Sequence, residues 1–154
     1  MEKKIEDFIK PGAKVHLVGV CGVSMAPLAE VLKGRGAAVT GSDMKESQTA
    51  DRLRALGIPV IIGHLPQSVE GADCVIRTAA VHDDNPEIAS ARRFNIPVFE
   101  RAQAWGAIMK HYKNAVCVAG THGKTTTTSM CTHIFLAAGR DPSVMIGGSL
   151  PILG

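Results

Sequence analysis

The sequence lacks an apolar run near the roughly 18 residues that a membrane-spanning helix needs, and its beginning, MEKKIEDFIK, lacks the apolar stretch of a secretory signal. It also lacks a block of basic residues, because the formal net charge is only +3 and the lysines and arginines are scattered among acids. That distribution predicts no surface for nucleic acid. We therefore expect a cytoplasmic protein that binds neither membranes nor nucleic acid.

Metal-binding and disulfide patterns are absent as well. The four cysteines form no Cys-x-x-C pair, and three of them lie in or beside apolar runs, which predicts buried, reduced thiols. The six histidines have neither the i, i+4 spacing nor the cysteine partners of a zinc site. The sequence therefore predicts no structural metal.

What the sequence does contain is a regular alternation of short apolar runs and helical patterns, in a composition typical of a globular protein. Strands are predicted at 15–20, 37–41, 59–62, 73–78 and 96–100. Helices are predicted at 24–34, with Ser24 as the N-cap, and at 49–56, 85–94 and 101–112. This alternation indicates an α/β fold, a Rossmann-like doubly wound parallel sheet. A further strand at 114–120 and a helix at 125–138 place a domain boundary near 105–114.

The stretch VAGTHGKTTTTSM, residues 118–130, puts glycines and a lysine between that last strand and helix. Glycines let backbone N–H groups turn toward phosphate oxygens, and a helix N-terminus adds partial positive charge. Lys124 would then reach the β- and γ-phosphates of ATP, and the Thr125 hydroxyl would join a Mg²⁺ shell. The usual P-loop has a glycine where this chain has Val118, so the loop is the shorter Gly-Thr-x-Gly-Lys-Thr. The alternative is an ordinary strand-turn-helix with a surface lysine.

A second glycine cluster, GVCGVSM at 19–25, follows the first predicted strand, where a dinucleotide-binding fingerprint would lie. The fingerprint is incomplete, because Cys21 and Ser24 stand where it has glycines. Only Gly19 and Gly22 are therefore left to form the tight turn and to allow close approach of a diphosphate.

Three polar residues follow the carboxyl ends of other predicted strands, where ligands of open α/β sheets bind. Asp43 could accept hydrogen bonds from a ribose or base, or it could be a turn or capping acid. His64 and Thr78 could contact a ligand, or they could be ordinary loop residues.

The segments HLVGVCGVSM, TGSDMKES, IIGH, TAAVHDDNPEI, ERA and VAGTHGKTTTTSM occur in the order and spacing typical of the Mur ligases. The chain resembles that family over nearly its whole length, and the shortened loop GTHGKT is the most specific element. Members have a Rossmann-like domain for the UDP end of the substrate, a central ATPase domain and a C-terminal amino-acid domain. The resemblance implies a UDP-sugar-binding domain at 1–106, followed at 107–154 by a linker and the truncated start of the central domain.

The resemblance also implies a reaction. ATP would phosphorylate the lactyl carboxylate of UDP-N-acetylmuramate, and the amine of L-alanine would attack the acyl phosphate. The SDMKES and DDNPE stretches favour the alanine-adding branch over the one that attaches a preassembled tripeptide. The family's adenine pocket, further Mg²⁺ ligands and amino-acid site have no counterpart in the sequence. We therefore expect a fragment that binds the sugar nucleotide without ligating it, and whose apolar C-terminal segment self-associates.

Carried onto this sequence, the resemblance assigns two sets of residues. The ATP-binding set is Gly120, Thr121, His122, Gly123, Lys124, Thr125 and Thr126, with Lys124 and Thr125 catalytic and Thr125 on Mg²⁺. The substrate-binding set is Gly19, Val20, Cys21, Gly22, Val23, Ser24, Ser42, Asp43, His64, Thr78 and Arg101. His122 contributes its backbone, while its side chain either touches a ligand or faces solvent.

Two other function classes remain as alternatives. An NAD-binding oxidoreductase domain would account for the first glycine cluster and Asp43, but it has no use for the loop around Lys124. A regulatory nucleotide-binding module without chemistry is the other.

Overall fold

The computed structural model describes residues 3–147 and 152 of the chain. It divides into two compact units, Met1–Lys113 and Asn114–Gly154. The expected boundary between 106 and 107 falls within a helix of the first unit. None of the helices in the described part of the chain has the length and apolar character of a membrane span.

A parallel sheet organises the first unit, and it has five strands within residues 3–147. The strands are β1 (Lys14–Val18), β2 (Ala38–Asp43), β3 (Val60–Ile62), β4 (Cys74–Arg77) and β5 (Val98–Glu100). Their order is β3-β2-β1-β4-β5. Strands β2 and β3 therefore lie on one side of β1, and β4 and β5, which come later in the chain, lie on the other side. In open parallel sheets ligands bind where the order reverses, at the carboxyl ends of the strands. That point lies between β1 and β4.

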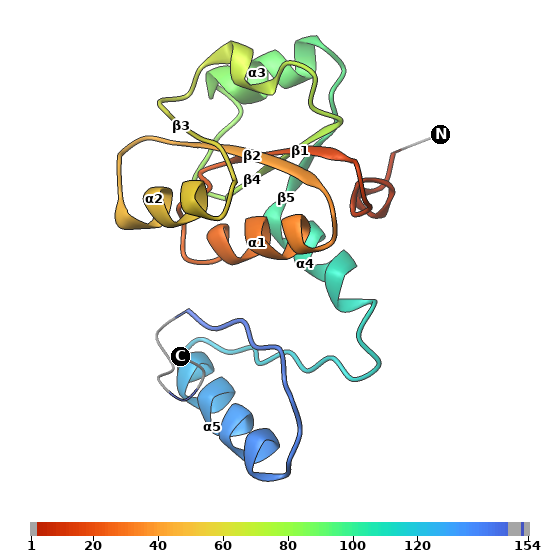
Figure 1. Ribbon diagram of the computed structural model, residues 1–154, viewed down its shortest axis with the longest axis vertical. Coiled ribbons are helices and arrows are strands. Elements are labelled where there is room, and N and C mark those ends of the chain that lie inside the picture. The colour runs from red at the N-terminus through yellow and green to blue at the C-terminus, as the bar shows by residue number, and fades with distance from the viewer. Residues whose placement is uncertain (1–2, 148–151, 153–154) are drawn as a thin grey trace. The chain divides into compact units, whose positions relative to one another are not determined.

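Helices cover both faces of the sheet, as the α/β class requires (Figure 1). The larger apolar core lies on the face covered by α1 (Ala26–Gly34), α2 (Gln48–Ala55) and α4 (Arg101–Met109). A smaller core, with Val18 and Ile88, lies under α3 (Pro86–Arg93). Two 3-10 helices, η1 (Ile5–Phe8) and η2 (Pro66–Val69), lie outside the elements that the sequence predicts.

The predicted fold class is confirmed, but two local predictions are wrong. Helix α1 begins at Ala26 with Met25 as its N-cap, and Ser24 makes no capping bond. The Ser24 hydroxyl instead accepts a hydrogen bond from Arg101. Residues 114–120, predicted as a strand, form no strand.

The cysteines also differ in part from expectation. The sequence predicts buried thiols, but only Cys74 is buried, whereas Cys21 and Cys131 are half-buried and Cys117 is exposed. Burial raises the pKa of the Cys74 thiol to about 12. This thiol is therefore protonated at neutral pH.

The second unit contains α5 (Lys124–Ala137), which begins where the sequence predicts. The hydroxyls of Thr128, Ser129 and Thr132 donate to the backbone carbonyls four residues earlier. Large apolar side chains of the unit are exposed, among them Val116, Met130, Ile134 and Phe135. The expected self-association through this segment stays a prediction.

One close approach in the sheet gives a test of the packing. A Cβ added to Gly41 of β2 would lie 2.6 Å from the Cβ of Val20, which is fully buried. We expect Gly41→Ala to lower the free energy of unfolding by about 1–3 kcal/mol, because the added carbon overpacks the core. Urea unfolding followed by circular dichroism measures the change.

Gly34, in α1, is the matched control because a Cβ there meets no atom within 4 Å. Gly34→Ala should raise the free energy of unfolding by up to about 1 kcal/mol, as expected for alanine in a helix. Equal stabilities of the two variants would contradict the packing described for Gly41.

Candidate functional site

A pocket of about 510 Å³ lies at the carboxyl ends of the strands of the first unit. Its walls come from the loop after β1, the segment after β2, and the residues that follow β3 and β4. The lining residues are Gly19, Cys21, Gly22, Asp43, Met44, Lys45, Ser47, Thr49, His64, Thr78, Ala80 and Val81. This is the edge where a ligand is expected from the strand order.

The glycine loop is fixed to its neighbours by sterics and by hydrogen bonds. Gly19 has a φ of +80°, and a Cβ there would lie 2.7 Å from Thr78 Cγ2, so a side chain is excluded on both grounds. The backbone N–H groups of Gly19 and Val20 both donate to the Ser42 carbonyl, at 2.9 Å. Cys21 and Ser24 have no positive φ, so the loop does not require glycine at either position.

Asp43 orients this loop from the end of β2. Its Oδ2 accepts a hydrogen bond of 2.8 Å from the Cys21 N–H, and its Oδ1 accepts one from the Met44 N–H. The carboxylate is thus a turn acid and also a residue of the pocket wall. Burial raises the pKa of the adjacent Cys21 thiol, and Asp43 adds to the rise. Cys21 therefore presents a neutral thiol at neutral pH.

Five predicted substrate residues do not line the pocket. Val20 packs against Gly41, and the side chain of Val23 is exposed. Ser24 is held by α4, because Arg101 Nη1 donates to its hydroxyl and Trp105 Nε1 donates to its carbonyl, the latter at 3.1 Å. Arg101 thus contacts the glycine loop through Ser24 and does not line the pocket. The fifth residue, Ser42, is fully buried.

The pocket wall also contains residues that sequence reasoning did not single out. Met44, Lys45, Ser47 and Thr49 follow β2, and Ala80 and Val81 follow β4. Lys45 adds a positive charge near the glycine loop, as an anionic ligand would need. The sequence signal for the first four positions is their place shortly after the strand that ends in Asp43, and for Ala80 and Val81 it is their place shortly after Thr78.

A polar network on the sheet face covered by α3 reaches the pocket through His64. Glu87 of α3 is fully buried, and its Oε2 accepts a hydrogen bond of 2.5 Å from the Ser42 hydroxyl and lies 3.0 Å from His64 Nδ1. Its Oε1 lies 3.4 Å from Nε2 of the buried His16, whose Nδ1 is 2.8 Å from Thr40 Oγ1. Glu87 therefore joins residues of two strands to a side chain of the pocket wall.

Glu87 is ionised at neutral pH despite its burial. Burial by itself raises the pKa of this carboxyl, but the contacts with His16 and Ser42 and the electrostatic interaction with His64 outweigh it. The pKa therefore lies below its ordinary value of 4.5.

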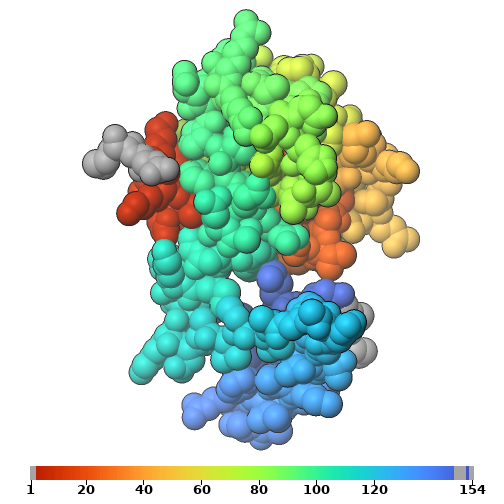
Figure 2. Space-filling model, turned by 180° about the vertical axis from the view of Figure 1, so that it is seen from behind, coloured from red at the N-terminus to blue at the C-terminus, as the bar shows by residue number. Residues whose placement is uncertain are grey.

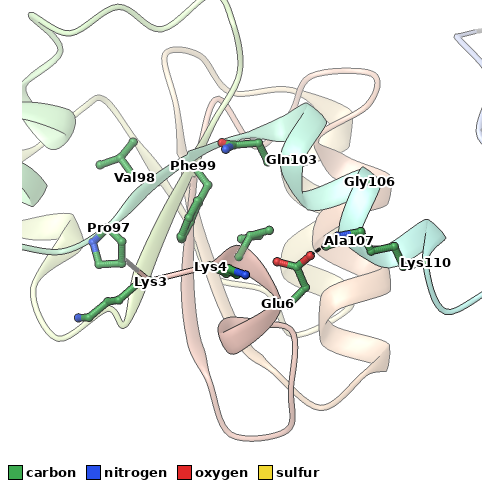
Figure 3. A pocket seen from close by; sticks show the side chains of 11 residues that line it. Lys3, Lys4, Glu6, Pro97, Val98, Phe99, Gln103, Gly106, Ala107 and Lys110 are labelled. Atoms are coloured by element: carbon green, nitrogen blue, oxygen red, sulfur yellow. Dashed lines mark hydrogen bonds and ion pairs between the residues drawn. The ribbon is translucent and has the colours of Figure 1, made fainter. Parts of the chain in front are cut away.

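A larger groove of about 740 Å³ lies elsewhere in the first unit, between η1, β5 and α4 (Figure 3). Lys3, Lys4 and Lys110 rim it, and Lys110 pairs with Glu6. Figure 2 shows the red N-terminal segment against the green-to-teal surface of β5 and α4. The groove contains no residue of the glycine loop or of the carboxyl ends of β1 and β4, so the smaller pocket is the candidate site.

The second glycine loop, in the second unit, leads into the N-terminus of α5. Gly123 has a φ of +76°, a conformation that favours glycine, and it is the N-cap of the helix. Lys124 Nζ donates to the carbonyls of Gly120 and Thr121, so the lysine lies over its own loop. Thr125 is exposed on the first turn, and its hydroxyl makes no hydrogen bond within residues 3–147.

The metal-binding capacity of these residues is small. The described residues contain no group of three histidine, cysteine, aspartate or glutamate side chains that could hold a metal ion. Mg²⁺ binds through one or two protein ligands, several waters and substrate phosphates, so a single hydroxyl on a phosphate-binding loop fits it.

Residues 14–113 match the family described as Mur ligase family, catalytic domain. The chain belongs to the Mur ligase family. It is 46% identical over its 154 residues to a UDP-N-acetylmuramate–L-alanine ligase of Caldanaerobacter subterraneus. It is 49% identical over 140 residues, or 91% of its length, to the enzyme of that name from Clostridium perfringens. The chain spans about a third of these relatives, 33% and 31% of their lengths.

Solved structures of Mur ligases share the fold. UDP-N-acetylmuramate-alanine ligase from Thermotoga maritima has a TM-score of 0.82 and 37% identity, over 90% of this chain and 33% of that one. UDP-N-acetylmuramate:L-alanyl-gamma-D-glutamyl-meso-diaminopimelate ligase from Neisseria meningitides has a TM-score of 0.84 and 30% identity, over 93% and 45%. Backbone similarity therefore does not separate the two kinds of Mur ligase, whereas identity is higher to the alanine ligase.

The buried carboxylate predicts how stability depends on pH. Because the pKa of Glu87 is lowered in the folded protein, its contribution to the free energy of unfolding is complete above pH 4.5 and is lost as the pH falls through the lowered pKa. Glu87→Gln should therefore be less stable than the wild type by about 1–3 kcal/mol at neutral pH, with a gap that narrows below pH 4.5.

Urea unfolding over a series of pH values measures the difference in the free energy of unfolding between Glu87→Gln and the wild type. Glu70→Gln, which removes an exposed carboxylate outside the network, is the control and should unfold with the same free energy as the wild type. A gap for Glu87→Gln that stays constant with pH would contradict the ionised state of Glu87.

Proposed function

We propose that the chain is the nucleotide-binding part of an ATP-dependent ligase that joins L-alanine to UDP-N-acetylmuramate in peptidoglycan biosynthesis. The observation that carries the proposal is the 44–49% identity, over 91% or more of the chain, to relatives named UDP-N-acetylmuramate–L-alanine ligase. Within this proposal the 154-residue chain binds the sugar nucleotide, and ligation requires the longer chain that the relatives have. A cytoplasmic location stays a prediction.

The sugar nucleotide occupies the pocket at the carboxyl ends of the strands. The turn at Gly19 and Gly22 lets the backbone approach the diphosphate, and Lys45, which lines the same pocket, supplies positive charge. Asp43 and His64 contact the ribose or the base. Ser24 and Arg101 do not line the pocket, so they stabilise the glycine loop through their mutual hydrogen bond and do not contact the ligand.

The loop before α5 takes the triphosphate. ATP with Mg²⁺ supplies the phosphoryl group that activates the substrate carboxylate. Lys124 leaves its own loop carbonyls to neutralise charge on the phosphates, and the N-terminus of α5 adds its partial positive charge. The Thr125 hydroxyl is the one metal ligand that we assign to this chain.

A Mur ligase that attaches a preassembled tripeptide is the second candidate. The structural similarity to the Neisseria enzyme, at a TM-score of 0.84, favours it as much as the alanine ligase. The choice between the two rests on sequence identity. An assay of the longer protein with L-alanine and with L-alanyl-γ-D-glutamyl-meso-diaminopimelate separates them, because only the true acceptor supports ATP-dependent phosphate release.

UDP-N-acetylmuramate should raise the melting temperature of the 154-residue chain, because it binds only the folded state, whereas NAD should not. Asp43→Ala should weaken the affinity about tenfold or more, since it removes a charged acceptor and releases the Cys21 N–H. Calorimetry measures the affinity. Asp84→Ala, at an exposed position outside the pocket, should bind within about twofold of the wild type. A melting-temperature rise with NAD alone would favour the oxidoreductase alternative.

In the longer protein, Lys124→Ala should lower ATP-dependent ligation by at least about a hundredfold, because the lysine stabilises charge in the transition state. The affinity for UDP-N-acetylmuramate should change by less than about twofold, since the two ligands use separate sites. Phosphate release and calorimetry measure the two effects. Near-normal ligation by this variant would contradict the assignment of the loop, and Lys113→Ala, outside it, is the control.

A further inference from the structure

A buried carboxylate lies directly behind one side chain of the pocket wall. The side chain of Glu87 is fully buried, so it reaches the pocket only through other residues. One of these is His64, whose ring lines the pocket and whose side chain is 12% exposed. Its Nδ1 lies 3.0 Å from Glu87 Oε2 and 3.1 Å from the Ser42 hydroxyl.

The hydrogen atoms in this cluster can be assigned one by one. The Ser42 hydroxyl has a single proton, and it donates that proton to Glu87 Oε2. An ionised carboxylate only accepts hydrogen bonds. His64 Nδ1 therefore faces two acceptors and must carry a hydrogen itself. In the neutral ring the other nitrogen, Nε2, is then an acceptor.

We propose that Glu87 is a positioning residue for nucleotide binding, which holds His64 with its Nδ1 protonated so that Nε2 accepts a hydrogen bond from the bound uridine nucleotide. The donor is a neutral one, either the imide N–H of the base or a ribose hydroxyl. This inference rests on the proposed binding of a uridine nucleotide in the pocket.

The carboxylate is itself fixed, which a positioning role requires. Behind it, Oε1 lies 3.4 Å from Nε2 of the buried His16. At its other oxygen, Ser42 is tied by its backbone carbonyl to Gly19 and Val20 of the glycine loop. The orientation of His64 and the position of the loop therefore depend on the same buried contacts.

A purely structural role for Glu87 is the rival explanation, and the tautomer of His64 separates the two. We would label the histidines of the 154-residue chain with ¹⁵N and record long-range ¹H–¹⁵N spectra at pH 8. Loss of signals in His64→Asn identifies that residue. The wild type should show His64 protonated at Nδ1, and the Nε2 resonance should shift when UDP is added. In Glu87→Gln, whose amide both donates and accepts, the ring should populate both tautomers.

Protonation of wild-type His64 at Nε2 would overturn the proposal. This measurement needs no variant of Glu87, so it decides even if Glu87→Gln does not fold.

Calorimetry with UDP tests the coupling to binding. Glu87→Gln and His64→Asn should each weaken the affinity about tenfold, and the double variant should bind no more weakly than His64→Asn alone. Glu70→Gln should bind within about twofold of the wild type. Losses that multiply in the double variant would show that Glu87 acts without His64 and would overturn the proposal.

Three nucleotide analogues identify the donor. N3-methyl-UDP lacks the imide N–H, and 2′-deoxy-UDP and 3′-deoxy-UDP each lack one ribose hydroxyl. One of them should bind the wild type more weakly than UDP does, with no such difference in His64→Asn. Equal binding of all four nucleotides to the wild type would overturn the proposed hydrogen bond. Failure of the wild type to bind UDP would instead overturn the proposed function, and this inference with it.

Discussion

Removing a carboxylate from water costs several kcal/mol unless protein groups replace the interactions that water made. Glu87 is such a buried carboxylate, so the fold of the first unit has to bring partners to it. Its partners come from β1, β2 and the loop after β3, so these elements and α3 have to pack together before Oε2 gains its hydrogen bonds and Oε1 its electrostatic contact with His16. The sheet face under α3 is consequently polar around His16, Thr40 and Ser42. The opposite face, against α1, α2 and α4, carries the larger apolar core.

The elements of the first unit could be predicted from the sequence because their signals are local. A short apolar run rich in β-branched residues predicts a buried parallel strand, and parallel strands bring their carboxyl ends to one edge of the sheet. Gly19, Asp43, His64 and Thr78 were placed at that edge on this ground, and all four line one pocket. For Asp43 the two alternatives are not exclusive, since a carboxylate that accepts two backbone N–H groups still has free lone pairs.

What the sequence did not reveal depends on residues far apart in the chain. Glu87 lies in a predicted helix, where a carboxylate is ordinarily exposed, and its buried contacts come from distant residues such as Ser42, 45 positions earlier. Ser24 looked like a helix cap, but Arg101, 77 positions later, binds its hydroxyl. The run at 114–120 has the composition of a strand, yet a strand exists only when another one pairs with it, and composition does not supply that neighbour.

The hydrogen bond from Trp105 Nε1 to the Ser24 carbonyl gives the molecule a built-in optical probe. Trp105 is the one tryptophan of the sequence, so its emission reports on a single environment. An indole that loses a carbonyl partner and gains water shifts its emission to longer wavelength. Rearrangement of the loop at Ser24 is therefore visible as a change of fluorescence colour, without any label attached to the chain.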